Sequence, residues 1–207
     1  SYLELVALAT ICDLVPLLGT NRSFVKFGLE ELNNTQRPGL LALFEEAAIK
    51  PPISSYHVGF VIGPRLNAMG RLEHALDSLR LLCTRDSQKA KILAQTLNET
   101  NRARQDLTEN SVAHALSQVT LSNLIVASDK SYDEGIIGLI AAKLVEKHYR
   151  PAIAISVGEK LSKGSARSIP GFHITEHLRS VSRLLVNVGG HSMAAGFTIE
   201  STKLTQF

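Results

Sequence analysis

One carboxylate of the sequence stands where it could bind a metal ion. Asp13, in the segment ATICDLVPL at residues 9–17, directly follows an apolar helical stretch and precedes a turn at Pro16. A carboxylate in this position is either a helix N-cap or a ligand for a cation, and its local sequence alone favours the cap.

A second segment, GPRLNAMGR at residues 63–71, could bind phosphate. Arg65 and Arg71 offer planar forks of donors that suit phosphate oxygens, and Asn67 can donate to phosphate or read a base edge. The glycines let a backbone approach a ligand closely. We expect a loop-rich segment at 60–74, and a surface loop with solvated arginines is the alternative.

A third segment, LSKGSARSIPGFHI at residues 161–174, has the composition of a phosphate cradle. On a strand, Ser165 and Arg167 would share one face. Ser168 adds a hydroxyl group, and nearby lysines and arginines give the region a positive excess. The alternative is a charged edge strand that is protected from pairing with another chain.

In the fourth segment, NVGGHSMAAGF at residues 187–197, Gly189 and Gly190 precede His191. The pattern suggests a turn entering a short helix whose amide groups bind an anion, with His191 as a donor or acid there. A purely structural histidine is equally compatible with these residues. In a fifth segment, residues 131–144, we expect Asp133 or Glu134 to cap a helix and Gly138 to serve only as packing scaffold.

Other chemistries find no support in the sequence. No Gly-x-x-x-x-Gly-Lys-Ser/Thr loop and no nucleophile elbow occur. His173 and His177 are four residues apart, but without a His-Glu-x-x-His pattern they do not indicate zinc. The two cysteines, Cys12 and Cys83, follow no metal spacing and suggest buried thiols.

The composition is that of a globular protein. Of the 207 residues, 44% are hydrophobic and 20% are charged, and the formal net charge is +3. No apolar run reaches the ~18 residues of a membrane span, and no secretory signal opens the chain, so we expect a cytoplasmic protein without a membrane contact. The chain begins without Met inside a helical pattern, which suggests a segment of a longer protein.

The hydrophobic pattern divides the chain into a helical part and an α/β part. Residues 1–83 suggest several short helices, and Asp86 is a suitable N-cap for a long helix over 87–118. Because residues 98–106 of that helix are almost wholly polar, we interpret it as a strut between two domains; a surface helix with a wet centre is the alternative. Strands near 124–127, 151–157, 162–169 and 195–199, with helices at 135–148 and 174–186, then predict an α/β module after residue 119.

The segments in their order resemble the RecJ family of single-strand-specific DNA exonucleases, in the DHH phosphoesterase superfamily. The resemblance runs from about residue 2 to residue 200, and residues 63–71 and 163–172 favour this family over its relatives. It implies an α/β fold with a partial, mainly helical DHH lobe at 1–85, a connecting helix at 86–118 and a DHH-associated domain with a mixed sheet at 119–207.

The resemblance also implies roles for individual residues. Asp13 matches a metal-ligating aspartate of the DHH lobe, and we expect Asp13 and His191 to act in catalysis. The segment at 63–71 would line the nucleic-acid path, and two further segments would bind phosphate or substrate. The residues expected to contact nucleic acid are Arg65, Asn67, Arg71, Ser165, Arg167, Ser168, Gly189, Gly190 and His191.

The implied activity is 5′-to-3′ exonuclease cleavage of single-stranded DNA in repair and recombination, with Mn²⁺ or Mg²⁺ as cofactor. Single-stranded DNA is the expected partner, together with single-strand-binding protein or a helicase. The Asp-x-Asp and Asp-His-His motifs of the superfamily are absent and would lie before residue 1. Most of the metal ligands would then also lie before residue 1, so we expect the segment alone to be inactive. The alternatives are a phosphodiesterase for short oligonucleotides or cyclic dinucleotides, and a non-enzymatic single-strand-binding relative.

Overall fold

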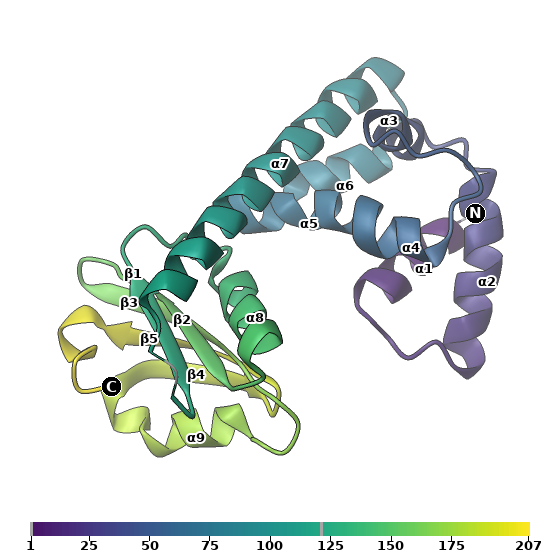
Figure 1. The fold of residues 1–207 in the computed structure, drawn as a ribbon. Coiled ribbons are helices and arrows are strands. Elements are labelled where there is room, and N and C mark those ends of the chain that lie inside the picture. Colours follow the sequence, from purple (N-terminus) through teal and green to yellow (C-terminus); the bar gives the residue numbers. More distant parts are fainter. Residues whose placement is uncertain (1, 121) are drawn as a thin grey trace. The chain divides into compact units, whose positions relative to one another are not determined.

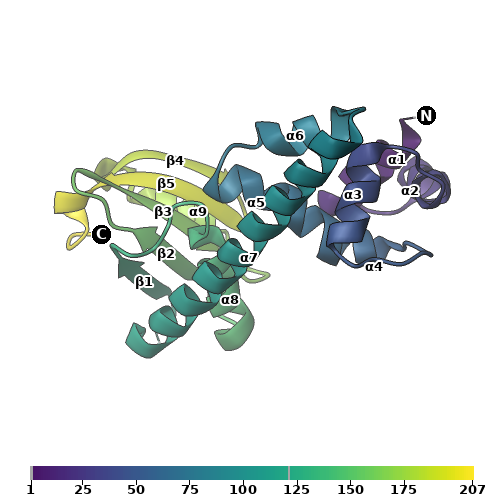
Figure 2. The same ribbon diagram turned by 90° about the horizontal axis from the view of Figure 1, so that it is seen from above.

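A computed structural model describes residues 2–120 and 122–207 (Figures 1 and 2). Ser1, in the expected 1–85 segment, and Leu121, in the expected 119–207 domain, lie outside the described residues. The chain forms two compact units, Ser1–Arg104 and Gln105–Phe207. The mixed α/β architecture confirms the predicted fold class. In the part of the chain that the structure describes, no helix is long and apolar enough to cross a membrane.

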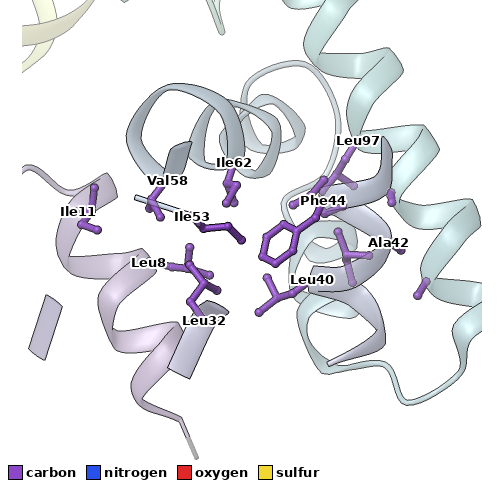
Figure 3. Packing of buried hydrophobic residues seen from close by; sticks show 14 of the residues in the cluster. Leu8, Ile11, Leu32, Leu40, Ala42, Phe44, Ile53, Val58, Ile62 and Leu97 are labelled. Carbon is purple, nitrogen blue, oxygen red and sulfur yellow. The ribbon is translucent and has the colours of Figure 1, made fainter. Parts of the chain in front are cut away.

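The first unit is helical, as the sequence predicts. Its elements are α1 (Leu3–Cys12), α2 (Gly19–Asn33), α3 (Pro38–Glu46), α4 (Ser55–His57), a π-helical turn (Val58–Ile62), α5 (Gly63–Leu72), α6 (Leu76–Cys83) and the first part of α7 (Ser87–Gln118). Pro38 is the first residue of α3, where its missing N–H costs nothing. Apolar side chains from all of these segments except α4 form one core, including Leu8, Leu32, Leu40, Phe44, Ile62 and Leu97 (Figure 3).

Residues 60–72 are helical, so the loop expected at 60–74 is wrong except at its last two residues. Pro64 occupies the first turn of α5, which suits its fixed φ and missing N–H. Gly63 packs against Cys12, because a Cβ atom at residue 63 would lie 2.7 Å from Cys12 Sγ. Ala68 and Met69 are buried in the unit. Local composition suggested a loop here, and packing against α1 outweighs it.

Helix α7 has the bounds that the sequence predicts. The Asp86 carboxylate accepts hydrogen bonds from the backbone N–H groups of Gln88, at 2.8 Å, and Lys89, at 3.2 Å, so it caps the helix as expected. The polar middle of α7 is not uniformly solvent-exposed, however, because Asn98 is only 1% exposed and Asn101 only 2%. The alternative of a surface helix with a wet centre is wrong at these two positions.

The second unit is built on a five-stranded mixed sheet in the order β1-β2-β3-β5-β4. Its elements are the end of α7, β1 (Ile125–Asp129), α8 (Ile137–His148), β2 (Ala152–Ser156), β3 (Leu161–Arg167), α9 (Ile174–Ser180), β4 (Leu185–His191) and β5 (Ala194–Glu200). Strands β1 and β2 are parallel, and the other pairs are antiparallel.

Helices α8 and α9 cover opposite faces of the sheet (Figure 1). Ile153, Ile155 and Ala166 pack with α9 in one apolar cluster. Because successive side chains of a strand alternate between faces, Ser165 and Arg167 lie on the α8 side.

Strand β4 was not predicted. The helix expected over 174–186 ends at Ser180, and the turn and short helix expected around Gly189 and Gly190 are instead a strand paired with β5. The exposed residues and glycines of this strand give no alternating apolar signal, so its pairing with β5 decides the structure. The cysteine prediction also fails in part, because Cys83 is exposed and Cys12 only half-buried.

Candidate nucleic-acid interface

In the second unit, three adjacent strands present one polar face on the α8 side. The antiparallel register aligns three rows across β3, β5 and β4: Lys163 with Thr198 and Asn187, Ser165 with Gly196 and Gly189, and Arg167 with Ala194 and His191. Directly paired residues of a sheet share a face. The centre of this polar face is open, because nothing lies within 4 Å of the position that a Cβ atom of Gly189 would take.

The Arg167 guanidinium is fixed at one end of this polar face. Its Nη1 donates to Ser165 Oγ at 3.0 Å and to the Ala166 carbonyl at 2.9 Å. Gly138, in the first turn of α8, makes room for it, because a Cβ atom there would lie 2.8 Å from Arg167 Nη2 and 3.2 Å from Ser165 Oγ. Gly138 is therefore more than the packing scaffold that the sequence suggested.

His191 ends strand β4 with an exposed ring. The ring Nδ1 accepts a hydrogen bond from the Met193 N–H at 3.3 Å, so the neutral ring carries its proton on Nε2, where it can be donated to a ligand. The His191 carbonyl accepts a 2.6 Å hydrogen bond from Thr175 Oγ1, and Thr175 is 1% exposed. Thr175 of α9 thereby fixes the position of this residue.

A shallow pocket of about 510 Å³ brings three of the expected residues together: Arg167, Ser168 and His191. Its other lining residues are Ala142, Val145, Met193 and Ala194. The buried Ser168 hydroxyl donates to the Phe172 carbonyl at 2.6 Å, so Ser168 shapes the turn after β3 and its proton is not directed at the pocket.

The two glycines before His191 differ in what they do. Gly190 has φ +147°, and a Cβ atom there would lie 2.2 Å from the Ala194 carbonyl oxygen, so only glycine fits. Gly189 is part of the open floor. Elsewhere in the unit, Asp133 does not cap α8, because its carboxylate accepts from the Gly135 N–H before the helix begins, and Glu134 forms an ion pair with Lys163.

In the first unit, Asp13 is the residue at the end of α1. Helix α2 begins only at Gly19, so the expected N-cap role of Asp13 is wrong. Its exposed carboxylate makes no hydrogen bond or ion pair with the residues that the structure describes. Burial and the nearby Asp13 charge together raise the pKa of the Cys12 thiol.

Asp13 fits a divalent cation as one ligand of a larger set. A hard, exposed carboxylate oxygen is the donor type that Mg²⁺ and Mn²⁺ prefer. Within residues 2–120 and 122–207, no three His, Cys, Asp or Glu side chains gather into a metal-binding group.

Helix α5 presents the remaining expected residues. Asn67 and Arg71 are exposed and one turn apart. Arg65 is half-buried: its Nε donates to Asn98 Oδ1 at 3.0 Å, and its Nη1 donates to the Val61 carbonyl at 2.8 Å. Asn98 and Thr175 were not predicted as residues that position the site. The only signal in the sequence for the buried contact of Asn98 was the presence of two asparagines, Asn98 and Asn101, in a polar stretch of α7.

Comparison with known proteins identifies relatives of the chain. A sequence model of the DHHA1 domain matches residues 121–207. The single-stranded-DNA-specific exonuclease RecJ of Bacillus subtilis is 39% identical over 206 residues, which cover 96% of this chain and 26% of that protein. RecJ of Thermus thermophilus is 36% identical over 207 residues, covering 100% of the chain and 30% of the relative.

Solved structures agree with the sequence matches. The crystal structure of Thermus thermophilus RecJ in complex with Mg²⁺ has a TM-score of 0.92 and 35% identity, covering 99% of this chain and 32% of that one. A structure described as exonuclease RecJ bound to manganese has a TM-score of 0.86 and 35% identity, with 52% of its chain covered. The chain spans between 26% and 38% of the length of its curated relatives.

Proposed function

Since the chain is a RecJ-type sequence that carries a DHHA1 domain, we propose that it is part of a single-strand-specific 5′-to-3′ DNA exonuclease that releases mononucleotides in DNA repair and recombination. The observation that carries this proposal is the polar face of β3, β5 and β4. On this face, a fixed Arg167 and an exposed His191 lie beside the paired glycines Gly189 and Gly196, which leave the surface of the sheet open.

This polar face suits the backbone of a nucleic acid better than its bases. Arg167 offers a planar set of donors to phosphate oxygens, and Nε2 of His191 offers one more. The open centre at Gly189 lets a strand approach the sheet closely, and the glycines bring no side chain that would discriminate between bases. Binding of this kind is independent of sequence and weakens with salt.

We assign the metal role to Asp13. In the whole protein, Mn²⁺ or Mg²⁺ would activate water and stabilise the leaving oxygen of a phosphodiester. This chain would contribute the exposed carboxylate of Asp13, which is rigidly attached at the end of α1. Helix α1 itself packs in the core of the first unit.

The proposed organisation follows the resemblance: a partial DHH lobe at 1–85, a connecting helix at 86–118 and a DHH-associated domain at 119–207. The DHHA1 match from residue 121 and the continuous helix α7 support these bounds. Single-stranded DNA would be the substrate in the cytoplasm, with single-strand-binding protein or a helicase as partners.

The test is nuclease activity of the full-length protein with Mn²⁺ on 5′-phosphorylated single strands and on dinucleotides. We expect long single strands to be degraded to mononucleotides. Asp13→Asn should abolish turnover with little change in strand binding measured with EDTA, whereas Glu30→Gln, an exposed acid-to-amide change on α2, should retain full activity.

Other results would point elsewhere. Preference for dinucleotides over long strands would indicate a short-oligonucleotide phosphodiesterase. Strand binding without any cleavage by the wild-type protein would indicate a non-enzymatic binding protein. Normal turnover of the Asp13→Asn protein would remove Asp13 from the metal site.

A further inference from the structure

Two buried asparagines of α7 each accept a hydrogen bond from an arginine. Asn98 Oδ1 accepts from Arg65 Nε at 3.0 Å, and Asn101 Oδ1 accepts from Arg104 Nη2 at 3.0 Å. The two amides are three residues apart and therefore lie on neighbouring positions of one helix face. Buried amides of this kind restrict the guanidinium groups to fixed positions.

The orientation of the Asn98 amide follows from the chemistry of its two partners. A guanidinium can only donate and a carboxylate can only accept, so Oδ1 must face Arg65 and Nδ2 must face Glu46, to which it donates at 2.8 Å. The amide thus separates Glu46 from Arg65, and the two side chains form no ion pair among the described residues. The positive charge of Arg65 is not directly neutralised by that carboxylate.

Further arginines lie next to this pair. Arg102 is one helical turn after Asn98 on the same side of α7; it is exposed and forms no hydrogen bond or ion pair within the described chain. Helix α5, which carries Arg65 and Arg71, lies beside α7 and is joined to it by the Arg65–Asn98 hydrogen bond (Figures 1 and 2).

The arginines also perturb each other electrostatically. Burial lowers the pKa of Arg65, and the charge of Arg102 lowers it further, with Glu46 opposing. Burial likewise lowers the pKa of Arg104, and Arg71 adds to the effect. Because a guanidinium stays protonated near neutral pH, these shifts reflect desolvation and repulsion between like charges. A bound anion would relieve the repulsion.

We propose that the α5–α7 surface of the first unit, formed by Arg65, Arg71, Arg102 and Arg104, binds the phosphates of a single nucleic-acid strand, and that α7 supplies Arg102 and Arg104 to it. The identity of the ligand rests on the proposed function. The four guanidinium groups lie on two adjacent helices, and buried amides hold two of them. Guanidinium groups offer the planar donor sets that phosphate oxygens accept.

The experiment measures strand affinity of the full-length protein with a 5′-phosphorylated single-stranded oligonucleotide, in EDTA so that nothing is cut, over a series of salt concentrations. The variants are Arg102→Gln and Arg104→Gln. The matched control is Arg85→Gln, an exposed arginine just before α7, which at 1.5 Å per helical residue lies more than about 20 Å from Arg102.

We expect each test variant to bind about 5-fold more weakly at 0.1 M salt, and the slope of log K against log salt to shrink by about 0.7 for each phosphate that the variant no longer binds. Arg85→Gln should behave like the wild type. Arg102 is exposed and has no partner among the described residues, so Arg102→Gln should leave the melting temperature unchanged. If Arg104→Gln proves to be destabilised, the affinity of Arg102→Gln decides the result.

The failures can be told apart. If the wild-type protein binds and degrades single strands but Arg102→Gln has the affinity and salt slope of the Arg85→Gln control, the α5–α7 site is wrong and the proposed function stands. If the wild-type protein binds no single strand at all, the α5–α7 site and the proposed function are both wrong.

Discussion

A single missing methyl group at Gly138 determines where the Arg167 guanidinium can lie. Helix α8 begins next to β3, and Arg167 Nη2 occupies the space that a Cβ atom of residue 138 would need. Arg167 then hydrogen-bonds to Ser165 and faces the pocket that it shares with His191. The position of the candidate phosphate contact therefore depends on a residue of another element.

We expect Gly138→Ala to weaken binding of a 5′-phosphorylated single strand by about 1–2 kcal/mol, because Arg167 must move away from Ser165. Folding should be unaffected or slightly stabilised, since alanine is the better helix former. Strand titration and thermal melting of the full-length protein check both effects. Gly59→Ala, where the nearest atom would be 3.7 Å away, is the control. Unchanged affinity would separate Gly138 from the site.

At the scale of elements, contacts between segments distant in sequence position the site residues. Thr175 of α9 holds the end of β4 through the His191 carbonyl. At the start of the second unit, His114 Nδ1 on α7 and the Tyr132 hydroxyl after β1 lie 3.0 Å apart with their rings edge to face. Each contact joins elements that the sheet alone does not connect.

Thr175→Val keeps the shape of the buried side chain but leaves the His191 carbonyl without this donor. We expect a loss of about 1–2 kcal/mol in the free energy of unfolding. Thr96→Val is the matched control, because that exposed hydroxyl only bonds back to Ile92 within α7. Chemical denaturation of both variants makes the comparison. Equal, small effects would mean that the Thr175 contact contributes no more than a surface hydroxyl.

Tyr132 makes stability depend on pH in the alkaline range. Burial, and then the charge of Asp129, raise the pKa of Tyr132 above its usual value near 10. The folded state thus holds this proton more tightly than the unfolded chain does. Its contribution to stability is complete below the unfolded pKa and is lost as the pH rises through that value towards the folded pKa.

We therefore expect the wild-type protein to lose stability above about pH 10 more steeply than Tyr132→Phe does. Denaturation at a series of pH values measures this, and Tyr149→Phe, at an exposed tyrosine, serves as control. If Tyr132→Phe and wild type lose stability in parallel, the phenol makes no such contribution.

Elements with a strong local signal were predictable, and those decided by tertiary contacts were not. Helix α7, its Asp86 cap and strands β1, β2, β3 and β5 follow from periodicity and capping. Helix α5 was mistaken for a loop because its proline and glycines read as loop formers, while its burial against α1 is not visible locally. Strand β4 has glycines and exposed residues, so only its partner β5 identifies it. Contacts between residues distant in sequence also explain why Asn98 and Thr175 were not predicted and why Gly138 was expected to be only packing scaffold.

At the scale of the whole molecule, each unit has a hydrophobic core of its own. Leu43 is fully buried in the first and Ile140 in the second. We expect Leu43→Ala to cost about 2–5 kcal/mol, seen chiefly as reduced hydrogen-exchange protection in residues 2–104, and Ile140→Ala to act chiefly on residues 122–207. Equal loss of protection throughout the chain for either variant would contradict separate cores.

The uninterrupted helix α7 has a consequence for how the chain can change in length. One residue inserted between Ala94 and Leu97 would rotate the later part of the helix by about 100° relative to the buried Ala90 and Ala94. Leu97, Asn98 and Asn101 would then leave the positions where they are now buried in the first unit. Loops absorb insertions and deletions, whereas this stretch of helix cannot, so evolutionary drift in length should be confined to the connections on either side of α7.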